Sequence, residues 1–203
     1  MYKNVIKRLL SILISATLLF FLWWVILLVA VAIKITDPNG PVIFKQKRIG
    51  YHGKVYYMYK FRSMKVNSEH TGSGVYSDAR DSRVTPIGRF IRKTSLDELP
   101  QLVNILKGDM ALIGPRSPLT YHPWPYEEYT EEQKKMFSVR PGLTGWAQIH
   151  GRKTVEWNKR IQMNVWYAEH CSFFLDLKIF FMTFYVVLFA KDNANVGATA
   201  IKK

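Results

Sequence analysis

Two adjacent carboxylates, Asp97 and Glu98, stand in the densest polar stretch of the sequence, Arg92 to Gln101. Ser95 and Glu98 have the spacing of a capping box, but Pro100 would then occupy the fifth helical position, where it removes a needed N–H group and clashes. A helix that begins near Asp97 accommodates Pro100 and places both acids at its N-terminus. Free N–H groups and the helix dipole keep a carboxylate ionised there, able to attack phosphorus or to bind Mg²⁺. Function and simple capping both remain open.

Basic residues recur beside glycine and proline elsewhere in the chain. Each of them alone is typical of a turn with an exposed cation. Three such arginines, together with two cations on a predicted hairpin, would supply the bidentate forks that a diphosphate needs. The members of this predicted clamp are Lys60, Arg62, Arg116, Arg140 and Arg152.

The composition narrows the function further. The 203 residues carry 29 Lys and Arg against 15 Asp and Glu, a net charge of +14, which favours a negatively charged partner such as phosphate, nucleic acid or an anionic membrane face. One cysteine excludes an intrachain disulfide, and the histidines lack zinc-site spacing. The motifs of dinucleotide-binding, P-loop, serine-hydrolase and zincin proteins are absent.

The segment from Leu9 to Ile33 is apolar except for two serines and a threonine. As a helix it would be roughly 37 Å long, enough to cross a hydrocarbon core. A cleaved signal peptide is the weaker alternative, because the core of such a peptide is shorter. Both flanks are basic and therefore indicate a cytoplasmic location, but no proline or glycine breaks the segment. Spanning and re-entrant helices both remain open.

Turn residues at Asp37–Pro41 end this segment and divide the chain into a membrane helix, 1–36, and one domain, 37–203. Val42 to Arg48 and Lys54 to Arg62 are predicted as a hairpin. Thr71 to Asp81 is a predicted mobile loop, with a lid function left open. An ordered loop is expected over 115–126. Thr85-Pro86 is expected to open a short helix, a second helix carries 99–106 and stops at Gly108, and a capping box at Thr130 starts a third. Further helices are expected over 154–170 and over 173–190, the last at a membrane surface or in the core.

Five ordered blocks of sequence resemble the bacterial sugar transferases, the small monotopic phosphoglycosyl transferases. The resemblance runs over nearly the whole chain and is carried by FKQKRIG (44–50), YKFRSM (59–64), SLDELPQ (95–101), LKGDMALIGPR (106–116) and RPGLTGWAQIHGR (140–152).

This resemblance implies an enzyme that moves a sugar-1-phosphate from a UDP-sugar to a polyprenyl (undecaprenyl) phosphate, releases UMP and initiates assembly of a lipid-linked glycan. Asp97 would be the nucleophile that forms an aspartyl-phosphosugar intermediate, and Glu98 would help it to hold Mg²⁺. Lys60, Arg92, Arg116 and Arg152 would contact phosphate or nucleotide. Gln148 and Asp176 would support the site.

The implied fold is α+β: an N-terminal re-entrant or spanning helix and a small, mostly helical catalytic domain with a β-hairpin and membrane-interface helices. The domain would lie on the cytoplasmic face of the bacterial inner membrane. The bilayer would be a partner and nucleic acid would not, while a homo-oligomer and contacts with downstream glycosyltransferases stay open.

The chain departs from the family pattern at several positions. Ser11 replaces an Asp, Trp23-Trp24 replaces a Ser-Pro break, Ser117 is inserted into Gly-Pro-Arg-Pro, and Asn164 replaces an Asp. Because the acidic pair and most basic residues are kept, an active enzyme is expected. The alternative is a non-catalytic, basic, membrane-anchored scaffold or binding protein in a polysaccharide assembly complex.

Overall fold

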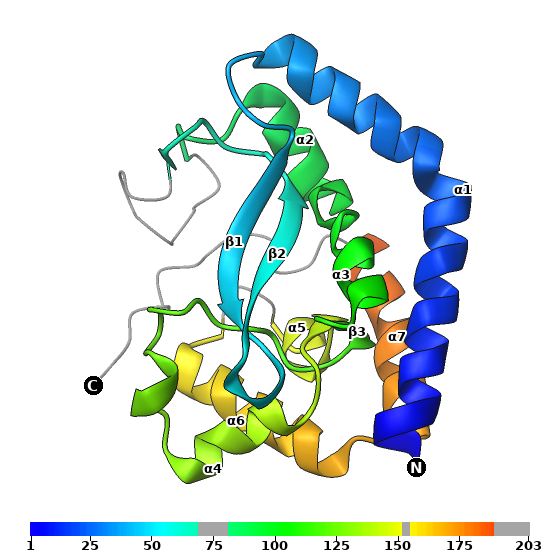
Figure 1. The fold of residues 1–203 in the computed structure, drawn as a ribbon, viewed down its shortest axis with the longest axis vertical. Helices are drawn as coiled ribbons and strands as arrows, with labels where there is room; N and C mark the ends of the chain where they lie inside the picture. Colours follow the sequence, from blue (N-terminus) through cyan, green and yellow to red (C-terminus); the bar gives the residue numbers. More distant parts are fainter. Residues whose placement is uncertain (69–80, 152–154, 189–203) are drawn as a thin grey trace.

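The N-terminal segment forms one long helix. The structure is a computed structural model that describes residues 1–68, 81–151 and 155–188. A short π-helical turn, Tyr2–Ile6, continues into α1, Lys7–Thr36, and together they form the one helix of the described residues that is long and apolar enough to cross a membrane. Figure 1 shows that α1 bends near its middle, although its sequence holds neither proline nor glycine.

Both halves of α1 pack against the rest of the chain. In the first half, Ser11 and Ser15 are buried and Ile14 packs against the main hydrophobic core. In the second half, Val29 and Ile33 form a separate buried cluster together with Phe61 and Ile91. The outward surface of the helix remains apolar and exposed: it includes Leu9, Leu13, Phe20, Phe21, Trp23, Trp24, Leu27, Leu28, Val31 and Ile35.

The predicted hairpin is confirmed, with boundaries that differ by one residue. Strands β1 (Ile43–Ile49) and β2 (Val55–Phe61) pair antiparallel, with Phe44 opposite Lys60. A 3-10 turn, Tyr51–Gly53, joins them, and its two left-handed residues, His52 and Gly53, reverse the chain. The hairpin therefore carries Lys60 near the end of its second strand.

Two short helices follow the hairpin and flank the acidic pair. Helix α2 (Pro86–Lys93) begins at Thr85, whose hydroxyl accepts a hydrogen bond from the Gly88 N–H. Helix α3 (Gln101–Lys107) ends at Gly108, which has φ 98° and donates its N–H to the carbonyl of Asn104. The predicted cap at Thr85 and the predicted stop at Gly108 are both confirmed.

The remaining elements close the domain. Strands β3 (Ala111–Ile113) and β4 (Gly142–Thr144) form a short parallel pair that the sequence did not predict. The predicted capping box at Thr130 is present. The helical elements of this part are η5 (Tyr126–Glu128), α4 (Glu131–Lys134), η6 (Lys135–Ser138), α5 (Trp146–Ile149), α6 (Trp157–His170) and α7 (Phe173–Leu188).

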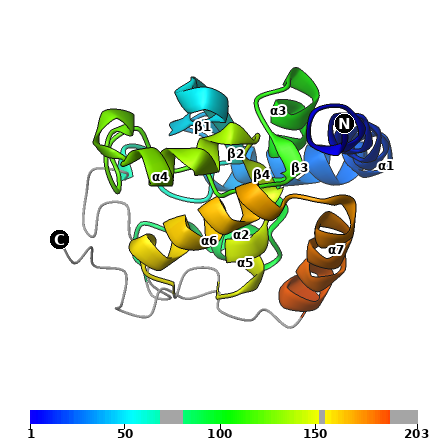
Figure 2. The ribbon, with the colours of Figure 1, turned by 90° about the horizontal axis from the view of Figure 1, so that it is seen from below.

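The described residues are thus a mixture of helix and sheet, as predicted. Helices α1 and α7 lie on the same side of the molecule in Figures 1 and 2, whereas the hairpin, α4 and α6 lie away from that side. Helix α7 also exposes apolar side chains, including Phe174, Leu177 and Phe181. Residues 71–80 of the predicted mobile loop lie outside the described residues.

Candidate active site

Asp97 and Glu98 lie in a single 3-10 turn, η4 (Leu96–Glu98), between α2 and α3. Ser95 precedes the turn in the left-handed conformation, with φ 60°, and its side chain makes no capping hydrogen bond. The capping box considered from the sequence is therefore not formed. The predicted helix start near Asp97 holds for the 3-10 turn, which begins at Leu96 and has both acids in its first turn, whereas the α-helix α3 begins only at Gln101, directly after Pro100. The two acids thus lie before α3, in a turn that the left-handed Ser95 introduces.

The turn buries one acid and pairs the other with a lysine of the hairpin. Asp97 is 9% exposed. The Lys60 ammonium donates to Oε1 of Glu98 over 2.7 Å, and these two side chains are 18% and 29% exposed. Three residues that the sequence assigned to one site, from β2 and from η4, are therefore brought together.

Two predicted arginines lie on neighbouring loops and helix ends. Arg92 is in the last turn of α2, and Arg116 follows β3; both are half-buried. The Arg116 backbone N–H lies 3.4 Å from Oδ1 of Asn164, which fixes the loop against α6. Within the part of the chain that the structure describes, neither guanidinium forms an ion pair, so both remain available to an anion.

Two other predicted arginines have partners of their own. Arg62 donates to Oδ2 of Asp37 over 2.9 Å and to the Asp37 carbonyl, just beyond the end of α1. Arg140 donates to the carbonyl of Gly108 over 3.0 Å and stacks on Tyr51, with its guanidinium carbon 4.9 Å from the ring centre. The structure thus joins neither of them to Glu98, and their binding of substrate stays a prediction.

Gln148 is placed on α5 with both polar atoms of its amide buried. Neither the amide nitrogen nor the amide oxygen has a hydrogen-bond partner within the described residues. Such a group costs free energy unless something pairs with it. Arg152 lies outside the described residues.

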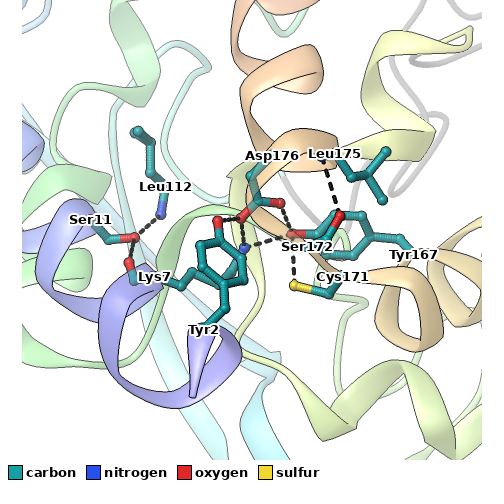
Figure 3. Close-up of polar contacts among 9 residues, drawn as sticks. All are labelled: Tyr2, Lys7, Ser11, Leu112, Tyr167, Cys171, Ser172, Leu175 and Asp176. Atoms are coloured by element: carbon teal, nitrogen blue, oxygen red, sulfur yellow. Dashed lines mark hydrogen bonds and ion pairs between the residues drawn. The ribbon is translucent and has the colours of Figure 1, made fainter.

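Asp176, the last predicted residue, lies in the first turn of α7 at the centre of a buried polar cluster (Figure 3). Its Oδ2 accepts hydrogen bonds from the Lys7 ammonium and from the Tyr2 hydroxyl, and its Oδ1 accepts one from the Tyr167 hydroxyl. The Lys7 and Asp176 side chains are only 6% and 8% exposed. Burial, followed by the nearby Asp176 carboxylate, raises the pKa of Tyr167, so this tyrosine stays a neutral donor.

The partners of Asp176 were not predicted from the sequence. Lys7 was considered as a topology signal and as part of the Lys-Arg start that the chain shares with the family, and neither Tyr2 nor Tyr167 was given a role in the site. Two of the departures from the family pattern also have buried roles. The Ser11 hydroxyl donates to the Lys7 carbonyl and accepts from the N–H of Leu112, which ties α1 to β3.

Ser117 is the second of these departures. Its hydroxyl lies 2.9 Å from that of Tyr56 in a buried hydrogen bond, and its carbonyl accepts from Arg48. Burial raises the pKa of Tyr56 to about 12, against the lowering effect of the bond to Ser117. The inserted serine is therefore part of the packed core beneath the Arg116 loop.

Comparison with known proteins shows the family of the chain. The family model described as bacterial sugar transferase matches residues 2–190. A Bacillus subtilis protein named uncharacterized sugar transferase EpsL is 45% identical over 91% of this chain and 88% of its own length.

Two larger relatives carry names that state an activity. The UDP-glucose:undecaprenyl-phosphate glucose-1-phosphate transferase of Xanthomonas campestris is 39% identical over 90% of this chain. The undecaprenyl-phosphate galactose phosphotransferase of Salmonella typhimurium is 35% identical over 94% of it. The matched regions span only 38% and 40% of those two proteins. The match over nearly all of this chain shows that it belongs to the bacterial sugar transferase family of enzymes.

Proposed function

We propose that the protein transfers a sugar-1-phosphate from a UDP-sugar to undecaprenyl phosphate and so begins the assembly of a lipid-linked glycan. An Asp97 carboxylate oxygen attacks the β-phosphorus of the donor and forms an O–P bond, while the bond from this phosphorus to the bridging oxygen breaks and UMP leaves. A phosphate oxygen of the acceptor then attacks the same phosphorus. Asp97 is released as a carboxylate and the product is undecaprenyl-diphosphate-sugar.

The observation that carries this proposal is the placement of Asp97 beside the Glu98–Lys60 pair. A buried carboxylate held in a tight turn has little freedom to lose when it attacks. Lys60 is paired with Glu98, the neighbour of Asp97 in the sequence, where it would offset the negative charge of an incoming diphosphate. Arg92 and Arg116 supply two further guanidinium groups for that charge.

The relatives' names support the substrate class and leave the sugar undecided. One name specifies glucose and the other galactose. Because the proposed clamp contacts the diphosphate, which all UDP-sugars share, the residues described above do not select among them.

We also propose that Asp97 and Glu98 hold Mg²⁺. Among the described residues no group of three or more His, Cys, Asp or Glu side chains gathers, so a cation site made by the protein alone is absent there. Mg²⁺ is usually bound by one or two carboxylates plus substrate phosphates, and the Asp97–Glu98 pair fits that donor set. When bound, the ion would neutralise charge on the transferred phosphate.

The membrane geometry that we favour is a re-entrant α1 beneath a cytoplasmic domain. In a spanning helix, only one end would contact the catalytic domain, because the rest would cross the bilayer. In this structure both halves of α1 pack against the same domain. The apolar outer surface of α1 and the exposed apolar residues of α7 lie on the same side of the molecule, where they would enter one leaflet. The reacting phosphates would then meet at headgroup level.

The reaction is tested by UMP release from the detergent-solubilised protein with Mg²⁺, a panel of UDP-sugars and undecaprenyl phosphate. Without acceptor, we expect at most one UMP per protein and a covalent phosphosugar adduct in the intact mass. Asp97→Asn abolishes both, whereas Glu131→Gln, at an exposed carboxylate, leaves both unchanged. EDTA suppresses release, and added Mg²⁺ restores it.

Two results would overturn parts of this proposal. Acceptor-dependent turnover without a burst or an adduct would exclude the aspartyl intermediate and favour direct transfer between the substrates. Absence of release with every donor, from folded protein, would favour the non-catalytic scaffold.

The topology is tested with single cysteines introduced at Asn4 and Asn39, which are exposed at the two ends of α1. The background is Cys171→Ser, which removes the buried native thiol. A re-entrant helix predicts that both cysteines react only after the inner membrane is permeabilised. Labelling of one of them in intact cells would establish a spanning helix.

A further inference from the structure

A second basic site lies at the N-terminal end of α1. A hollow there is lined by residues from four separate segments, among them Lys3, Lys7, Arg8, Tyr51, Ser138 and Arg140. Four of these six side chains are cationic. The hollow lies at the opposite end of α3 from Asp97, since Arg8 binds the carbonyls of Ile105 and Leu106 in the last turn of that helix. The two sites are thus separated by the length of α3, about 10 Å.

Three of the four cations are held by neutral oxygen atoms. Lys3 donates to the carbonyls of Ala168 and Glu169 at the end of α6, Arg8 binds the end of α3, and Arg140 binds the Gly108 carbonyl. These contacts fix the directions of the side chains and satisfy helix ends. They do not neutralise the charges.

The acids near the hollow are already engaged. Asp176 is paired with Lys7, and Asp109 lies 3.5 Å from Lys107 and accepts a hydrogen bond from Asn104. Burial, followed by the like charge of Arg140, lowers the pKa of Arg8, while the Asp109 carboxylate acts in the opposite direction. An anion placed between Arg8 and Arg140 would relieve the repulsion between their charges. The capping of helix ends alone would not require two cations so close together.

The position of the hollow indicates the kind of anion. It is lined by the first turns of the N-terminal helix, directly before the apolar run that starts at Leu9. If α1 enters the bilayer as proposed above, this point lies at the depth of the lipid headgroups. Headgroup phosphates are the most abundant anions there.

We propose that this hollow is a phosphate-binding site separate from the catalytic centre, with Lys3, Arg8 and Arg140 as its cations. Its ligand is the phosphate group of an anionic lipid headgroup or a free phosphate ion. The assignment gives Arg140 a role in attachment at the membrane surface in place of the donor clamp predicted from the sequence.

The test measures thermal stability of the full-length protein in a neutral detergent. It is titrated with dioctanoyl-phosphatidylglycerol, with inorganic phosphate and with dioctanoyl-phosphatidylcholine, whose choline cancels the phosphate charge. We expect a saturable increase in Tm with phosphatidylglycerol and little change with phosphatidylcholine. An increase with phosphatidylglycerol alone identifies the lipid as the source, and an equal affinity for inorganic phosphate identifies the free ion.

The decisive variant is Ser138→Glu, because it introduces a negative charge at an exposed position that lines the hollow and removes none of the capping contacts. We expect binding to weaken about tenfold or more, while the matched Ser138→Gln variant binds like wild type. The control Lys45→Gln, at an exposed position of the hairpin, lowers the net charge by one as Ser138→Glu does, and it also binds like wild type.

The proposal fails if neither phosphatidylglycerol nor phosphate gives a saturable response. It also fails if Ser138→Glu and Ser138→Gln respond equally or if phosphatidylcholine is as effective as phosphatidylglycerol. The readout needs no turnover, so its failure leaves the proposed transferase reaction untouched.

Discussion

The chain holds two lysine–carboxylate pairs that differ in their surroundings. Lys60 and Glu98 join the hairpin to η4 and remain 18% and 29% exposed, next to a second acid, Asp97. Lys7 and Asp176 join α1 to α7, and their side chains are only 6% and 8% exposed. Two tyrosine hydroxyls also donate hydrogen bonds to the Asp176 carboxylate.

This difference separates chemistry from attachment. Three donors occupy three of about four acceptor sites of the Asp176 carboxylate. Because this side chain is also buried, it is poorly placed to bind a substrate or a cation. The Glu98 pair lies near the surface, where an incoming phosphate can compete for Lys60. Glu98 and Asp176 were predicted from the sequence to belong to one site. We infer instead that Asp176 anchors the N-terminal helix.

The largest expected effect that sharpens this contrast comes from Asp97→Asn. We expect UMP release to fall by about three orders of magnitude or more, because the nucleophile is lost. The Tm should change by only a few degrees, since the amide keeps the shape of the side chain. A variant that loses activity and stability together would indicate that Asp97 is structural.

Asp176→Asn should have the opposite profile. Removal of one partner leaves the Lys7 charge buried without compensation, which costs about 3–5 kcal/mol of unfolding free energy. Thermal unfolding in detergent measures this loss. The double variant Lys7→Met/Asp176→Asn should regain part of it, because no charge is then buried; if the single variant unfolds like wild type, the anchor role is wrong.

Lys60→Gln should reduce activity more than stability. We expect kcat/KM to fall about 10- to 100-fold, because the variant loses a partly exposed cation next to the proposed transferred phosphate. The free energy of unfolding should fall by at most about 1 kcal/mol, since the Lys60–Glu98 pair is partly exposed. Steady-state kinetics and thermal unfolding on one preparation test both parts. Lys107→Gln, at an exposed lysine, is the control.

The smallest effect is expected for Tyr167→Phe. This variant removes one donor to Asp176 and one acceptor for the Lys7 ammonium, while the Lys7–Asp176 pair and the Tyr2 donor remain, which should cost about 1–2 kcal/mol. Activity at a temperature well below the Tm should stay close to wild type. A strong loss of kcat without loss of stability would instead connect the buried cluster to the reaction.

Local signals in the sequence were sufficient for most secondary structure. The Thr85 cap, the Gly108 stop and the Thr130 capping box each depend on residues within a few positions of one another, and all three are present. The left-handed Ser95 that precedes the acidic turn was not predicted, because a non-glycine residue rarely takes this conformation.

Contacts between residues far apart in the sequence could not be predicted from such local signals. The β3–β4 pair joins Ala111 to Gly142, and nothing local marks either three-residue strand. The residue types of the clamp were also insufficient, because the sequence does not reveal which groups lie opposite a given arginine. Arg62 has Asp37 as its partner and Arg140 has a backbone carbonyl.

The Lys7–Asp176 pair also concerns the order of events during synthesis. Its members are 169 residues apart, so the ribosome adds Asp176 about 10 to 30 seconds after Lys7. During that interval the apolar α1 can already meet the bilayer, while the lysine that will later be buried is still hydrated. If α1 enters the membrane as proposed above, its entry can precede the docking of Lys7, and the later-made α7 then holds α1 in place through Asp176.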